Sequence, residues 1–227
     1  LGPRSHGKPP PGRLASKTRH WLGAWMVVQK HKSEGAGERL AIEQPRRATR
    51  SRSTYVYAPG TQALPENVAV KVLDGRFTIT AIIDIPREGA EGVIICHGSA
   101  RGGHSLFIQH RRAYYAHNYL GIVELRVASN DDVSAGTLCI RFEFEATARP
   151  DPEHDVGAPG VGRLYFDERL VGETALPVTI PLAIGRGAVL TTVGRNPGSS
   201  VSTLYEPPFP FTGTIRSVMY DRLARER

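Results

Sequence analysis

The amino-acid sequence predicts an all-β protein, an antiparallel β-sandwich preceded by a basic arm. Between residues 54 and 203, short segments of alternating apolar and polar side chains follow one another at regular spacing, separated by turns rich in Gly, Pro and Asp. Helical periodicity is almost absent from this region. A rigid lead-in, Tyr205-Glu206-Pro207-Pro208-Phe209-Pro210, then precedes an alternating run that is typical of a strand closing a sandwich late in the chain.

The arm is residues 1–50, which hold eleven Lys or Arg against three Asp or Glu, a net charge of +8. The other 177 residues hold 18 basic and 19 acidic residues, a net charge of −1. Pro9-Pro10-Pro11 and the scarcity of apolar residues predict disorder, with a short amphipathic helix over residues 21–28 as the alternative. Contact of this arm with an anionic membrane or nucleic acid is the less favoured reading. No segment reaches the ~20 apolar residues of a membrane span.

Residues 51–222 form the predicted sandwich domain. Its expected strands, in chain order, are residues 55–57, 67–73, 76–85, 93–96, 105–109, 113–119, 122–128, 137–145, 162–166, 170–174, 178–180, 189–193 and the closing run to Tyr220. Asp74-Gly75 is a strong hairpin signal between the second and third of these. Residues 93–96 are apolar without alternation and therefore predict a buried strand. The long gap over residues 146–160 predicts an excursion at the rim of the sandwich.

The closing run is expected to place Phe211, Gly213, Ile215 and Ser217 on one face of the final strand.

Each cysteine also has a predicted position. Cys139 alternates with apolar neighbours and should face outward, whereas Cys96 lies inside the apolar run 93–96. Two unpaired thiols are the expectation, and a disulfide between them is the alternative.

The order of several motifs resembles the C-terminal region of bacterial arylsulfatases of the alkaline-phosphatase-like sulfatase family. The motifs that carry the resemblance are Tyr55-Val56-Tyr57-Ala58-Pro59-Gly60-Thr61, Ile79-Thr80-Ala81, Gly89-Ala90-Glu91-Gly92-Val93-Ile94, Gly102-Gly103-His104-Ser105-Leu106, Arg141-Phe142-Glu143-Phe144, Tyr205-Glu206-Pro207-Pro208-Phe209 and Phe211-Thr212-Gly213-Thr214-Ile215. The likeness spans residues 51–220, and the arm matches nothing in it. It implies a lectin-type, concanavalin A-like jelly roll that packs beside a catalytic domain.

The family's chemistry requires a formylglycine, formed from Cys or Ser within a Cys/Ser-x-Pro-x-Arg motif, and a calcium site. Neither cysteine of this chain, Cys96 or Cys139, lies in such a motif, and no serine does. The resemblance therefore implies that the catalytic domain is absent, that no catalytic residue and no cofactor belong to this chain, and that it cleaves no sulfate ester by itself.

Three further groups of residues are candidate sites. His97, His104, His110 and His117 cluster in one third of the sandwich, but a transition metal needs three or four converging ligands, so ordinary strand-edge histidines are expected. Two acidic loops, Asn130-Asp131-Asp132 and the group Asp151, Glu153 and Asp155, have the oxygen ligands of a Ca²⁺ site, although solvated turn carboxylates are the expectation. The stretch from Gly98 to Gly103 resembles a phosphate loop in composition, yet a tight connection between two strands fits it better.

At least one of Tyr114, Tyr115 and Tyr119 should face outward, and Tyr114 and Tyr119 are the candidate glycan contacts.

The favoured hypothesis is a non-catalytic module of an arylsulfatase-type hydrolase that docks on a sulfatase catalytic domain, in cis or as a separate chain. It predicts a large exposed apolar patch. The alternative is a free-standing carbohydrate-binding module, which predicts an aromatic-lined groove or a Ca²⁺-linked sugar site. A decayed gene product is the third reading. A bacterial source is expected, with the cytoplasm and the periplasm both open.

Overall fold

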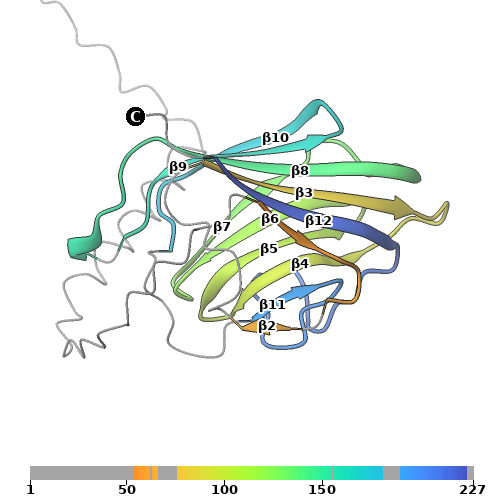
Figure 1. Ribbon diagram of the computed structural model, residues 1–227, viewed down its shortest axis with the longest axis horizontal. Helices are drawn as coiled ribbons and strands as arrows, with labels where there is room; N and C mark the ends of the chain where they lie inside the picture. The colour runs from red at the N-terminus through yellow and green to blue at the C-terminus, as the bar shows by residue number, and fades with distance from the viewer. Residues whose placement is uncertain (1–53, 62, 66–75, 155, 181–189, 224–227) are drawn as a thin grey trace, which may run out of the picture. The chain divides into compact units, whose positions relative to one another are not determined.

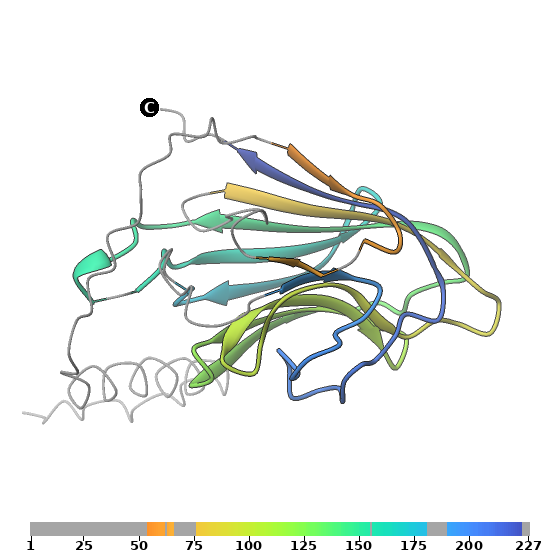
Figure 2. The same cartoon turned by 60° about the horizontal axis from the view of Figure 1, so that its bottom comes forward.

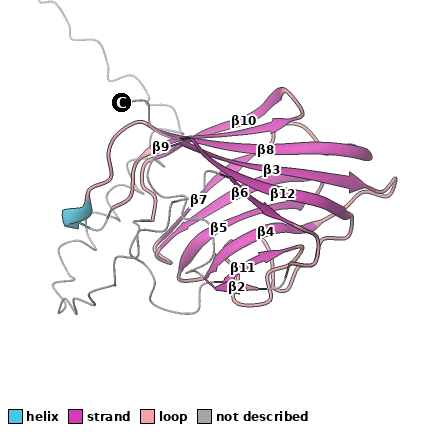
Figure 3. Cartoon of the chain, viewed as in Figure 1, coloured by secondary structure: helices cyan, strands magenta, loops and turns pink. Residues whose placement is uncertain are grey.

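The computed structural model describes residues 54–61, 63–65, 76–154, 156–180 and 190–223. These residues form two antiparallel sheets that face each other, which confirms the predicted all-β sandwich (Figures 1 and 3). The predicted disordered arm, the predicted strand 67–73 and the Asp74-Gly75 hairpin lie outside the described residues. Among the described residues, no helix is long and apolar enough to span a membrane.

Sheet A has six strands in the spatial order β1-β12-β3-β8-β9-β10. Their bounds are Thr54–Tyr57 for β1, Thr214–Leu223 for β12, Arg76–Ile85 for β3, Gly136–Ala146 for β8, Gly160–Phe166 for β9 and Arg169–Leu176 for β10. The final strand therefore inserts between the first and third strands and completes the sheet. The predicted excursion lies between β8 and β9, and it contains a short 3₁₀ turn, Pro152–His154.

Sheet B also has six strands, in the order β2-β11-β4-β5-β6-β7. Their bounds are Leu64–Pro65 for β2, Leu190–Val193 for β11, Gly92–Ser99 for β4, Gly102–Gln109 for β5, Arg112–Tyr119 for β6 and Val123–Ala128 for β7. The predicted strand over residues 178–180 is wrong, because this segment pairs with neither sheet and runs as a connection after β10.

The core lies between the two sheets, where the alternation of each strand places its apolar side chains. In β3 the inward residues are Phe77, Ile79, Ala81, Ile83 and Ile85, all buried. Across the core, the ring of Tyr115 in sheet B stacks on Phe142 in sheet A, with centroids 3.5 Å apart.

One segment packs against the side of sheet B that faces away from sheet A. We call this segment, residues 194–213 between β11 and β12, the strap. In Figure 2 it passes in blue along that outer face. A second apolar cluster forms beneath it, with buried Val93, Cys96, Phe107 and Ala116 from the sheet against Val201 and Tyr205 from the strap. Strand β4 is thus covered on both faces, which explains why its sequence is apolar without alternation.

A β-bulge in β12 changes which of its residues face the core. Ile215 pairs with Ile83 and Ser217 with Ile82, so Arg216 is the extra residue. The bulge reverses the alternation, and Ile215, Val218 and Tyr220 are the buried residues. The prediction that Ser217 shares a face with Ile215 is wrong for this reason.

Both cysteines are free. Cys96 is buried under the strap, whereas Cys139 in β8 is half-buried on the outer face of sheet A, as predicted. Because they lie in different sheets, the prediction of two unpaired thiols is confirmed.

Candidate functional site

The two candidate glycan contacts, Tyr114 and Tyr119, lie on opposite faces of β6. Their separation is odd, and alternate residues of a strand point to opposite faces of the sheet. Tyr114 is half-buried on the outer face of sheet B, while Tyr119 is only 4% exposed and points into the sandwich. A single sugar therefore cannot contact both tyrosines. The expectation that one tyrosine faces outward is met by Tyr114.

Tyr114 lies in a cross-strand row between Phe107 of β5 and Ala128 of β7. The rings of Phe107 and Tyr114 stack with centroids 5.3 Å apart and planes at 16°. Ala128, on the other side of Tyr114, belongs to β7, the last strand of sheet B. The Tyr114 ring is thus supported on one side by Phe107.

Beside this row, Glu124 and Arg126 project from the same face of β7. Arg126 pairs with Ala116 and Glu124 with Asn118, so Arg126 is diagonal to Tyr114 and within reach of its ring. The guanidinium donates twice to the carboxylate, from Nε to Oε1 at 2.6 Å and from Nη2 to Oε2 at 2.9 Å. Such bidentate pairs fix the orientation of the arginine.

Glu124 is also the main anchor of the strap. The Thr203 backbone N–H donates to Oε2 at 2.9 Å, its hydroxyl donates to the same oxygen at 3.0 Å, and the Ser202 hydroxyl donates to Oε1. Burial alone would raise the pKa of Glu124, but the hydrogen bonds from Arg126, Ser202 and Thr203 lower this pKa below its ordinary value. The carboxylate is therefore charged at neutral pH.

Arg126 keeps one free edge in this arrangement. Its Nε and Nη2 donate to Glu124, and Nη2 also donates to the Thr203 hydroxyl at 2.5 Å. Nη1 has no acceptor among the described residues, and the side chain is 36% exposed. The result is a fixed guanidinium with unused N–H donors beside a supported tyrosine ring.

The strap holds its position through aromatic contacts and hydrogen bonds to sheet B. Tyr205 packs edge-on against Phe107 at 4.9 Å, and Phe209 stacks on Tyr205 at 5.2 Å. Gln109 donates from Nε2 to the Leu204 carbonyl at 2.6 Å, and Asn118 donates from Nδ2 to the Val201 carbonyl at 3.0 Å. Phe107, which supports Tyr114, is thus itself held by the strap.

Sequence reasoning missed Glu124, Arg126 and the strap. The alternation of residues 122–128 does place Glu124 and Arg126 on one face, and this was the available signal. No local pattern, however, indicates that the segment around Pro207 folds back over a sheet one hundred residues earlier in the chain.

Three of the four candidate histidines come together. His97, His104 and His117 are paired neighbours in β4, β5 and β6 and all face the core, while His110 lies in the exposed turn between β5 and β6. Among the described residues, no group of three or more His, Cys, Asp or Glu side chains is arranged to hold a metal ion.

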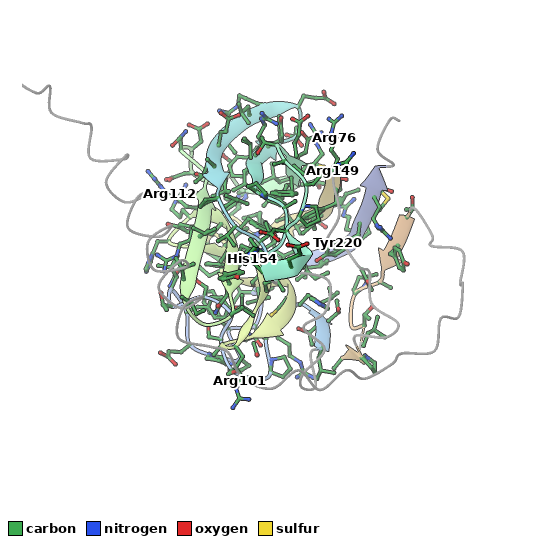
Figure 4. All side chains as sticks on the ribbon, turned by 90° about the vertical axis from the view of Figure 1, so that its left-hand side faces the viewer. Arg76, Arg101, Arg112, Arg149, His154 and Tyr220 are labelled. Atoms are coloured by element: carbon green, nitrogen blue, oxygen red, sulfur yellow. The ribbon has the colours of Figure 1, made fainter. Side chains whose placement is uncertain are left out.

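The acidic loops hold arginine or histidine partners. Asp131 pairs with Arg169, and Asp132 pairs with Arg111 at 3.2 Å. Asp151 contacts His154 Nδ1 at 2.7 Å, and Asp155 lies outside the described residues. His154, which is labelled in Figure 4, is the last residue of the short 3₁₀ turn. These described carboxylates therefore form ion pairs at turns.

The glycines from Gly98 to Gly103 belong to the β4–β5 hairpin, as predicted. Gly98 and Gly103 are directly paired, and a Cβ on Gly103 would lie 2.1 Å from the His97 carbonyl oxygen. Glycine is needed here because two backbones approach closely. Arg101 at the tip of the turn points away from the sandwich (Figure 4).

Comparison with known proteins places the chain in no sequence family. No family model matches the sequence, and no curated protein matches it. Among solved structures, the CBM40 module of the Ruminococcus gnavus IT-sialidase bound to α2,3-sialyllactose has a TM-score of 0.47 and 13% identity, covering 77% of this chain and 92% of that one. The same module bound to α2,6-sialyllactose has a TM-score of 0.45 and 11% identity, covering 77% and 93%.

The binding domain of botulinum neurotoxin serotype C1 is also similar, with a TM-score of 0.41 and 13% identity over 65% of this chain and 33% of that one. Neither the site nor its ligand follows from likenesses at these scores.

Proposed function

We propose that this chain is a carbohydrate-binding module that holds a sugar on the outer face of sheet B. The observation that carries the proposal is the juxtaposition of Tyr114 with the fixed guanidinium of Arg126. An amphipathic aromatic side chain offers apolar surface to the C–H groups of a sugar ring, and the neighbouring N–H donors bind its oxygen atoms.

The unused N–H donors of Arg126 favour an acidic sugar. Arg126 uses two of its nitrogens to hold Glu124, and its Nη1 donors point to no described acceptor. The two N–H groups of Nη1 remain available, and a carboxylate or sulfate group would accept a charge-assisted hydrogen bond from them. Because Glu124 already has several donors, it is the orienting partner of the arginine.

A docking module of an arylsulfatase-type enzyme remains the second proposal, carried by the sequence resemblance. That role calls for a large apolar face. The exposed large apolar side chains among the described residues are Val56, Ile82 and Leu170. They lie on β1, β3 and β10 of sheet A, separated by polar side chains that include the pairs of Arg163 with Glu145 and Glu173. This surface supports docking less than the outer face of sheet B supports glycan binding.

Calorimetric titration of the full chain with sialyllactose and with lactose tests the proposal, since the two differ by one carboxylated sugar. We expect saturable binding of sialyllactose and at least tenfold weaker binding of lactose. Replacement Tyr114→Ala should weaken binding about tenfold, equivalent to about 1.4 kcal/mol, because the supported ring is lost. Arg126→Gln should abolish the preference for the acidic sugar.

Tyr165→Ala is the matched control, because Tyr165 is a half-buried tyrosine on the outer face of the other sheet, beneath the Arg141 guanidinium. It should leave binding unchanged. Titration in chelator separates a Ca²⁺-linked site from the one proposed, which needs no metal. The absence of heat with carboxylated, sulfated and neutral glycans alike, or unchanged affinity in folded Tyr114→Ala, would contradict the proposal.

A further inference from the structure

Three histidines of sheet B, of which His104 and His117 are buried and His97 is half-buried, each bond a different segment of the chain. We call His97, His104 and His117 the histidine row, because they are consecutive cross-strand partners that face the core. His97 Nδ1 bonds the Thr191 hydroxyl of β11 at 2.7 Å, and His104 Nε2 bonds the Tyr220 hydroxyl of β12 at 2.8 Å. His117 Nε2 accepts the backbone N–H of Ile180 at 3.0 Å. The row thus connects the middle strands of sheet B to its strand β11, to β12 of sheet A and to residues 178–180.

The bond to Ile180 fixes the tautomer of His117. A backbone N–H can only donate, so Nε2 must present its lone pair and the proton of the neutral ring must reside on Nδ1. That Nδ1–H is buried and has no partner among the described residues. In the charged ring both nitrogens carry protons, and Nε2–H would then face the Ile180 N–H. Protonation of His117 and its bond to Ile180 are therefore mutually exclusive.

The surroundings of the row do not compensate a positive charge. His104 lies between the other two histidines, and Tyr115 and Tyr220 are the titratable groups that pack on it. Tyr115 also stacks near His117, and Leu125 of β7 is the cross-strand neighbour on its other side. Burial lowers the pKa of His97 and of His117 to about 4, while burial and the two neighbouring histidines hold the pKa of His104 well below its ordinary value.

We propose that His117 is an acid-released clamp, which fastens residues 178–180 to sheet B at neutral pH and releases them in acid. The sign follows from linkage. Because the folded pKa values lie below the ordinary value of 6.5, the unfolded chain binds more protons between pH 6.5 and about 4. Stability is therefore unaffected above this window and falls as the pH is lowered through it. This inference does not depend on glycan binding.

Urea unfolding of the full chain across pH 7.5 to 4.5 tests the clamp. Replacement His117→Gln keeps a neutral acceptor for the Ile180 N–H but cannot be protonated. Between pH 6 and 4.5, the unfolding equilibrium constant of the native chain should rise as the pH falls. For each pH unit, the factor by which it rises should be about ten times smaller in this variant, because one titrating histidine is gone. His110→Gln is the matched control, since His110 lies in the exposed β5–β6 turn, and it should keep the native slope.

Nitrogen-resolved NMR of the unaltered chain supplies a second measurement that does not depend on the variant's folding. We expect His117 to carry its proton on Nδ1 at pH 7.5 and to stay neutral at pH 5.5. A proton on Nε2, a titration near pH 6.5, or a native slope in folded His117→Gln would each overturn the clamp.

Discussion

At the scale of single residues, this protein depends on a few positions where the backbone or a ring leaves no room for change. Gly103 is one of them. It has a φ of 136° and lies where a Cβ would meet the His97 carbonyl oxygen at 2.1 Å. Both the positive φ and the close approach of β4 require glycine, and the next residue is His104, the middle member of the histidine row.

We therefore predict that Gly103→Ala destabilises the protein by about 2 kcal/mol or more, from backbone strain and overpacking. Gly198→Ala provides the control, because a Cβ there meets nothing within 4 Å and the backbone has no positive φ. Urea unfolding at pH 7.5 measures both variants. Equal stability of the two would show that the hairpin adjusts to the extra methyl group.

At the scale of elements, the strap is the feature that distinguishes the two faces of the sandwich. It covers Phe107 and Ala116 on sheet B, and its Ser202 and Thr203 bind Glu124. The outer face of sheet A has no such cover among the described residues and instead presents exposed ion pairs such as Arg216 with Asp84. The candidate site forms where the covered part of sheet B ends.

Removal of the Glu124 carboxylate should loosen the strap locally. In Glu124→Ala, the donors of Ser202, Thr203 and Arg126 lose a half-buried charged acceptor, at a cost of about 1.5–3 kcal/mol. Hydrogen exchange of residues 200–205 should speed up more than that of β5 or β6. Glu145→Ala, which removes exposed ion pairs with Arg163 and Arg76, should cost less than about 1 kcal/mol. Comparable exchange in both variants would refute the anchoring role of Glu124.

At the scale of the whole molecule, the two sheets separate the chain's two thiols into different environments. Burial raises the pKa of Cys96 to about 12. Cys139 lies on the outer face of sheet A, where burial and the charge of Asp167 also raise its pKa. Neither thiol is activated, and they lie in different sheets.

Titration with an aromatic disulfide reagent should accordingly detect about one slowly reacting thiol in the native protein and both thiols after denaturation. A reductant should leave the melting temperature unchanged, because both cysteines are free. Cys139→Ser should remove the native reaction. Rapid reaction of two thiols in the native protein would mean that the strap does not protect Cys96.

Alternation along the chain was enough to predict the fold class and most strands. Strands β3 and β8 have one apolar and one polar face, and this pattern depends only on whether each side chain meets the core or water. The hairpin at Gly98 and Gly103 was equally predictable, since closely paired strands require glycine. The resemblance to sulfatase C-terminal regions, by contrast, stays a prediction.

Only the tertiary structure decided which outward residues could form a site. Tyr114 and Tyr119 looked equivalent in sequence, but the register of β6 exposes the first and buries the second. The pairing of Arg126 with the strap joins residues 77 positions apart, and the bond from Ile180 to His117 spans 63. Such contacts depend on chain reversals. The bulge at Arg216, in turn, shifts the buried face of β12 by one residue. Local patterns report what a residue prefers to contact, whereas the fold decides which partner it meets.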